Sequence, residues 1–115
     1  MRMRKKKNLL PRMDACGALL IQTPTAEKGH WRKRKPDAAK LRLELGCGKG
    51  RFTAETAAAH PEDLYVAIER VPDAMVIAME RCQALGLTNV FFIDGDVAAA
   101  GRQGGIEAPS ARTGQ

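Results

Sequence analysis

The sequence has few of the features that mark secreted, metal-binding or membrane proteins. Its three cysteines, Cys16, Cys47 and Cys82, are odd in number and widely spaced, with no CxxC or Cys/His cluster. We therefore predict buried thiols, with no disulfide framework and no metal site. No apolar run approaches the roughly 20 residues of a membrane span, and only residues 8–11 follow the basic start where a signal peptide would have its apolar core. We expect a cytoplasmic protein with no membrane partner.

Histidine and tryptophan are also scarce. His30 and His60 are the two histidines, and both are interpreted as surface or helix-capping residues, not as catalytic bases. The single tryptophan, Trp31, lies among basic residues. It suits stacking on a nucleic-acid base and anchoring of the surrounding segment equally well.

Positive charge is concentrated at the start of the chain. Residues 1–40 hold 12 Lys/Arg and three Asp/Glu, whereas residues 41–115 hold seven and ten, so the two parts carry +9 and −3 of the net +6. Such an arm is typical of contact with a polyanion. The predicted RNA-binding residues are those of its first basic cluster: Arg2, Arg4, Lys5, Lys6, Lys7 and Arg12. A second cluster spans residues 28–35, and the stretch 13–22 between them is expected to dock on the core.

The core has the pattern of an α/β protein. Short apolar runs at residues 41–45, 64–68 and 89–94 predict strands, and residues 51–59 and 72–86 between them predict helices. Strand and helix alternate, so we predict a parallel β-α-β-α-β half-sheet of Rossmann-like type, preceded by the basic arm. The predicted divisions are the arm 1–40, a ligand-binding half-domain 41–97, and a disordered or out-of-register tail 98–115.

Acidic residues stand at the ends of all three predicted strands. Glu44 precedes a glycine cluster, Glu69 closes the second strand, and Asp96 follows the third. Parallel sheets bind ligands at the carboxyl ends of their strands, and glycines let the backbone approach a ligand closely. The candidate cofactor-binding residues are therefore Glu44, Gly46, Gly48, Gly50, Glu69 and Asp96.

The chemistry of these acids favours S-adenosylmethionine as the cofactor. Its sulfonium and α-amino groups are cationic, whereas the pyrophosphate of a dinucleotide would be repelled by Glu44. Glu69 suits hydrogen bonds from both ribose hydroxyls, and Asp96 suits the exocyclic adenine amine. The dinucleotide motif GxGxxG requires glycine where Arg51 stands, and the phosphate-loop motif GxxxxGK[ST] requires glycine where Leu43 stands.

The same residues carry a family resemblance. Arg4-Lys5-Lys6-Lys7-Asn8-Leu9, the run from Leu43 to Phe52, Val66-Ala67-Ile68-Glu69, and Leu87-Thr88-Asn89-Val90 leading to Gly95-Asp96 resemble the bacterial tRNA (guanine-N7) methyltransferases, which belong to the class I S-adenosylmethionine-dependent methyltransferases. The resemblance spans roughly residues 1–97. It implies that Glu44, Glu69 and Asp96 bind the donor, and that the methyl group goes to N7 of a variable-loop guanine in tRNA.

One departure from the family is large. Its members continue with an Asp-Pro-Trp motif and a basic Lys-Arg-Arg stretch that form most of the substrate pocket, and neither motif occurs here. Any catalytic residues are expected in that part, so we expect this chain alone to bind the donor weakly and to transfer no methyl group. Three alternatives stay open: another class I methyltransferase fragment, a non-catalytic basic RNA-binding module, and a reading frame broken after Val97.

Overall fold

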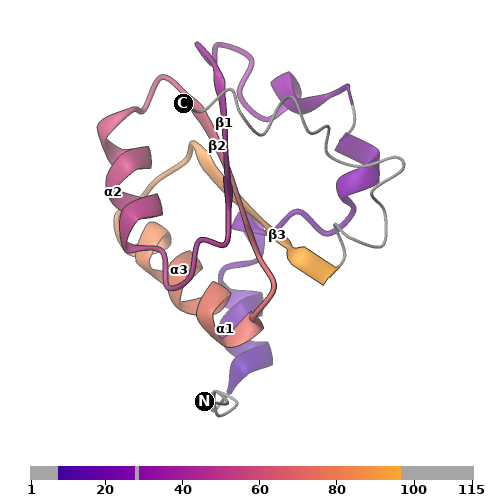
Figure 1. The fold of residues 1–115 in the computed structure, drawn as a ribbon, viewed down its shortest axis with the longest axis vertical. Coiled ribbons are helices and arrows are strands. Elements are labelled where there is room, and N and C mark those ends of the chain that lie inside the picture. The colour runs from indigo at the N-terminus through magenta and orange to yellow at the C-terminus, as the bar shows by residue number, and fades with distance from the viewer. Residues whose placement is uncertain (1–7, 28, 97–115) are drawn as a thin grey trace.

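The computed structural model describes residues 8–27 and 29–96, which form a three-layered arrangement (Figure 1). The elements, in chain order, are α1 (Leu9–Ala15), the 3-10 helices η1 (Gly17–Leu19), η2 (Pro24–Glu27) and η3 (Trp31–Lys33), then β1 (Leu41–Leu45), α2 (Arg51–Ala59), β2 (Leu64–Glu69), α3 (Pro72–Ala84) and β3 (Val90–Asp94). The predicted strands and helices of the core are confirmed to within two residues at each end.

The three strands form one parallel sheet in the order β1-β2-β3. Leu43 pairs with Val66, and Ala67 pairs with Phe92, so each strand is in register with the next. The predicted parallel half-sheet is therefore confirmed. All three carboxyl ends lie at the same edge, which brings the predicted acids to one side of the molecule.

Apolar side chains cover both faces of the sheet. On the face toward α2 and α3, Ala67 and Phe92 pack against helix residues such as Met79. On the opposite face, Val66 and Ile93 pack against residues from the segment before β1. Figure 1 shows α2 and α3 on one side of the sheet and that N-terminal segment on the other. Burial on both faces is what parallel strands require, since neither face is solvated.

The N-terminal segment is part of this core in the described residues. Arg12 in α1 forms a bidentate ion pair with Glu80 of α3, with N–O distances of 2.6 and 2.8 Å. Leu20 then makes a parallel bridge to Phe92, and the Ile21 amide donates to the Phe92 carbonyl at 2.8 Å. The expected docking of residues 13–22 is thus confirmed, and the segment extends the sheet beyond β3.

The third strand begins at Val90, one residue later than predicted, and Asn89 directly before it has a structural role. Its side chain is buried, and Nδ2 lies 3.0 Å from the carbonyls of Ala57 and His60 and 3.1 Å from that of Asp63. These carbonyls belong to the end of α2 and the turn that leads into β2. Asn89 therefore holds this turn against the start of β3.

In residues 8–27 and 29–96, we find no helix long and apolar enough to cross a membrane.

Asn89→Ala should lower the free energy of unfolding by about 2–3 kcal/mol, because buried carbonyls lose their donor. Urea denaturation followed by circular dichroism measures this. Gln83→Ala is the matched control: Gln83 is exposed, and its amide donates to the Ala15 carbonyl, so a much smaller loss is expected. Equal losses of stability in the two variants would show that the three hydrogen bonds of the Asn89 side chain stabilise the protein no more than the exposed Gln83 contact does.

Candidate functional site

The glycine cluster forms a tight bend between β1 and α2. Gly46, Gly48 and Gly50 adopt φ values of +74°, +58° and +81°, a region that residues with a Cβ rarely occupy. The Gly46 amide donates to the Ile68 carbonyl at 2.7 Å, so the bend lies across the end of β2. Gly50 packs so closely on α3 that an added Cβ would lie only 2.6 Å from the Ala78 Cα and closer still to its Cβ.

Glu69 joins this bend to the start of α3. Its Oε1 accepts the Gly48 amide at 2.7 Å, and its Oε2 accepts the Val71 amide at 3.0 Å. The carboxylate is buried, with 8% of the residue exposed. The sequence therefore predicted the position of Glu69 next to the glycines correctly, although in this structure both oxygens bind the protein's own backbone.

A pocket opens beside Glu69 at the carboxyl edge of the sheet. It has a volume of about 550 Å³ and is lined by Leu45, Gly46, Ile68, Glu69, Arg70, Val71 and Gly95. These residues come from the ends of all three strands, and the volume is in the range of small-molecule sites. The pocket matches the ligand position expected for a parallel α/β sheet.

Asp96 lies next to this pocket, one residue beyond Gly95. Its Oδ1 is 3.4 Å from Nε of Arg70, and both side chains are more than 70% exposed. An ion pair this exposed contributes little to stability. The Asp96 carboxylate is therefore exposed to solvent.

The Glu44 side chain does not line this pocket and instead binds two hydroxyl groups. Its Oε1 accepts the hydroxyl of Thr53 at 2.5 Å and that of Tyr65 at 3.0 Å. It lines a second hollow of about 290 Å³ on the helical side of β1, together with Phe52 and Thr56. Of the three predicted acids, Glu69 lines the pocket at the carboxyl edge, whereas Glu44 and Asp96 lie outside its lining, Asp96 directly after the lining residue Gly95.

Burial and nearby carboxylates raise the pKa values of two side chains in this region, Cys47 and Tyr65. Burial, and after it the charges of Glu69 and Glu44, raises the pKa of Cys47 to about 12. Cys47 therefore stays a neutral thiol and is no candidate nucleophile. Burial, followed by the charge of Glu44, also raises the pKa of Tyr65, so its hydroxyl stays protonated and donates to Glu44.

The predicted RNA-binding residues are described only in part. Arg2, Arg4, Lys5, Lys6 and Lys7 lie outside the described residues, as does the predicted tail 98–115. Arg12 is described, and its charge is paired with Glu80. Trp31 packs against the apolar core on the face opposite α2 and α3, which favours anchoring over base stacking.

Sequence reasoning missed the side chains that surround the predicted acids. Arg70 contacts Asp96 and would collide with any Cβ at Gly95, and Thr53 and Tyr65 bind Glu44. Alternation along β1 and β2 was an available signal for Tyr65, because it places Glu44 and Tyr65 on one face. No comparable local signal exists for Arg70.

A parallel sheet with a glycine bend, a buried acid and a pocket at its carboxyl edge defines a Rossmann-like α/β ligand-binding domain. Comparison with known families is more specific: residues 38–100, more than half of the chain, match the family described as "Putative methyltransferase". The chain belongs to this methyltransferase family.

Individual relatives agree with this assignment. A tRNA (guanine-N(7)-)-methyltransferase of Halalkalibacterium halodurans is 42% identical over 79 residues, which are 69% of this chain and 36% of that protein. Proteins of the same name from Lacticaseibacillus casei and Clostridium acetobutylicum are 35% and 39% identical, over 84% and 78% of this chain and 45% and 42% of their own lengths. The chain thus spans less than half of these three relatives.

One solved structure is also similar, but only weakly. It is a SAM-dependent methyltransferase from Thiobacillus denitrificans in complex with S-adenosyl-L-homocysteine, with a TM-score of 0.47 and 21% identity, covering 83% of this chain and 39% of that one.

Gly50→Ala should destabilise the protein by about 3–5 kcal/mol, because it combines a left-handed φ with a collision against Ala78. Gly46→Ala is the matched control: its φ is similar, but nothing lies within 4 Å of the added Cβ, so a loss of only about 1–2 kcal/mol is expected. Urea denaturation measures both. A Gly46→Ala variant as unstable as Gly50→Ala would contradict the close approach of the bend to α3.

Proposed function

We propose that this chain is the donor-binding part of a tRNA (guanine-N7) methyltransferase, and that S-adenosylmethionine binds in the pocket at the carboxyl edge of the sheet. The observation that carries the proposal is the placement of Glu69, whose buried carboxylate touches the glycine bend and lines that pocket. The family to which the chain belongs supports a methyl donor as the ligand.

The donor set of the pocket suits this ligand. Each carboxylate oxygen has two acceptor positions, so the Glu69 oxygens that hold Gly48 and Val71 retain capacity for two ribose hydroxyls. Asp96 is exposed at the rim and suits the adenine amine. Glu44 lies on the other side of the bend, where its negative charge favours a cationic ligand at long range.

The relatives' names support the proposed reaction and substrate. Each of the three is called a tRNA (guanine-N(7)-)-methyltransferase. N7 of guanine carries a free lone pair and no proton, so its methylation needs alignment with the donor and no general base. Alignment of this kind contributes about 7–11 kcal/mol when the geometry is right. The absence of a reactive thiolate at Cys47 is consistent with this chemistry.

The basic arm suits the RNA substrate. Neutralising phosphates releases counterions, which makes RNA binding favourable and salt-dependent. The +9 charge of residues 1–40 fits this role, and tRNA as the substrate fits the expected cytoplasmic location. A non-catalytic RNA-binding module would share the arm but would not need the pocket, so donor binding discriminates between the two.

S-adenosylhomocysteine should bind the 115-residue chain with measurable heat in titration calorimetry, and Glu69→Ala should weaken it at least tenfold. Glu69→Gln, which keeps the shape and one acceptor oxygen, should be weakened less. Glu55→Gln is the control, because Glu55 is an exposed acid on α2, and its affinity should equal that of the wild type.

Thermal melts of the same variants show whether a loss of binding reflects unfolding. If folded wild-type protein releases no heat with S-adenosylhomocysteine, the proposed donor site is wrong. A non-catalytic RNA-binding module would then be the better explanation.

Methyl transfer should need more than this chain. With radiolabelled S-adenosylmethionine and unmodified tRNA, we expect label in the RNA from the full-length Lacticaseibacillus casei relative and none from the 115-residue chain. The physical reason is that a donor pocket alone does not align the guanine. Turnover comparable to that relative would show that the chain also seats the RNA. Label at a position other than N7 of guanine would reject the proposed specificity.

A further inference from the structure

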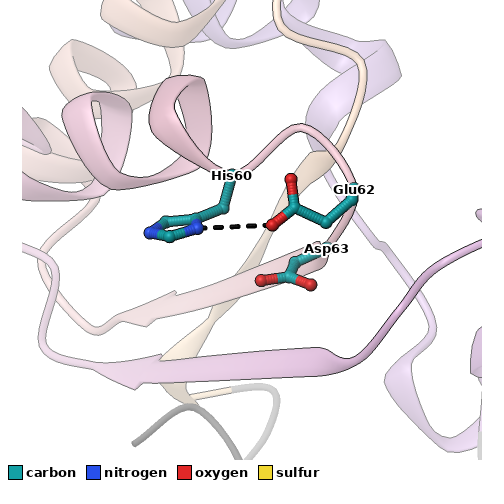
Figure 2. A group of neighbouring side chains, drawn as sticks. All are labelled: His60, Glu62 and Asp63. Atoms are coloured by element: carbon teal, nitrogen blue, oxygen red, sulfur yellow. Dashed lines mark hydrogen bonds and ion pairs between the residues drawn. The ribbon is translucent and has the colours of Figure 1, made fainter.

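A second cluster of ligating side chains lies at the opposite end of β2 from Glu69. His60, Glu62 and Asp63 occupy the turn between α2 and β2, and Figure 2 shows their side chains gathered beside this turn. One ligand atom from each residue lies within 4.8 Å of the other two. An imidazole and two carboxylates are a donor set that divalent transition metals accept.

Asp63 provides an independent indication of a ligand. The residue is 1% exposed, and its Oδ2 forms an ion pair with Nε of Arg42 at 2.7 Å. Its Oδ1 is also buried but has no hydrogen-bond partner. Leaving a buried carboxylate oxygen unsatisfied is costly and uncommon. A cation bound beside it would satisfy this oxygen without breaking the pair with Arg42.

The turn that carries the cluster is fixed by backbone hydrogen bonds. The Asn89 side chain holds the carbonyls of His60 and Asp63, the Asp63 amide donates to the His60 carbonyl at 3.0 Å, and the Ala39 amide donates to the Glu62 carbonyl at 2.8 Å. The backbone of the turn is therefore already ordered. A ligand that binds there loses little free energy to ordering it, which favours binding.

We propose that His60, Glu62 and Asp63 bind one divalent transition-metal ion, with Zn²⁺ as the best match. Two ligands about 2.0–2.2 Å from a tetrahedral Zn²⁺ lie roughly 3.3–3.6 Å apart. Nδ1 of His60 and Oε2 of Glu62 are 3.4 Å apart in a hydrogen bond that a bound ion would replace without moving the two atoms far. Both side chains are partly exposed, 40% and 55%, so the ion has a route from solvent and a water completes its coordination.

The position of the cluster assigns a structural role to the ion. His60 follows the last turn of α2, and Asp63 directly precedes β2, so the ion joins the helix end to the strand. The donor pocket lies at the other end of β2. Zinc binding should therefore raise thermal stability, since a ligand that binds only the folded state stabilises it, and it should leave donor affinity unchanged.

Titration calorimetry of the full chain with ZnCl₂, after chelator treatment, tests the proposal. We expect one saturable site and a rise in Tm, with affinity at least tenfold lower in His60→Ala and in Glu62→Gln. Glu62 is exposed and His60 is partly exposed, so the variants should fold. His30→Ala and Glu55→Gln are matched controls that remove an exposed histidine and an exposed acid outside the cluster, and both should bind zinc as the wild type does.

NMR of the two imidazole rings gives a second readout. Zinc should shift the ring signals of His60 and leave those of His30 unchanged. The proposal is overturned by wild-type affinity in His60→Ala, by loss of binding in His30→Ala, or by the absence of a saturable site in folded wild-type protein. MgCl₂ in place of ZnCl₂ should give no comparable heat, and equal Mg²⁺ affinity would contradict the assignment to transition metals.

Discussion

The carboxylate of Glu69 is the point on which the geometry of the pocket depends. One oxygen binds the glycine bend that follows β1, and the other binds the amide at the start of α3. The two βα connections, which contribute the Gly48 and Val71 amides, are thereby held against the end of β2. The same buried carboxylate lines the pocket, so the residue that shapes the site also places a negative charge in it.

Packing between the two helices makes this arrangement rigid. The close contact of Gly50 with Ala78 leaves no space for a side chain between the start of α2 and the middle of α3. The bend can shift only if α3 also shifts, and α3 is held by the sheet and by the Arg12–Glu80 pair. The glycine at position 50 therefore serves the packing of the two helices.

Local signals in the sequence were sufficient for the half-sheet and for the place of Glu69 beside the glycine bend. Alternating apolar runs, Pro72 at a helix start and glycines at turns determine each element separately. The strand-end position of Glu44 did not reveal its partners Thr53 and Tyr65, which are nine and 21 residues away, although strand alternation places Tyr65 on the same face of the sheet. The burial of Asp63 could not be predicted from local sequence either. Its partner Arg42, which binds Oδ2 and leaves Oδ1 without a hydrogen bond, lies 21 residues away.

The charge count of the sequence needs a similar correction. Several arginines of the basic segment bind partners within the protein: Arg12 pairs with Glu80, Arg34 pairs with Glu27 and lies 4.9 Å from the centre of the Phe91 ring, and Arg32 donates to the Ala38 carbonyl. These side chains fasten the segment to the sheet, and their charge is partly neutralised there. Arginine suits such paired and stacked contacts, because its planar guanidinium presents several donors at once. The net charge of residues 1–40 therefore overstates the positive charge that this segment presents to a partner.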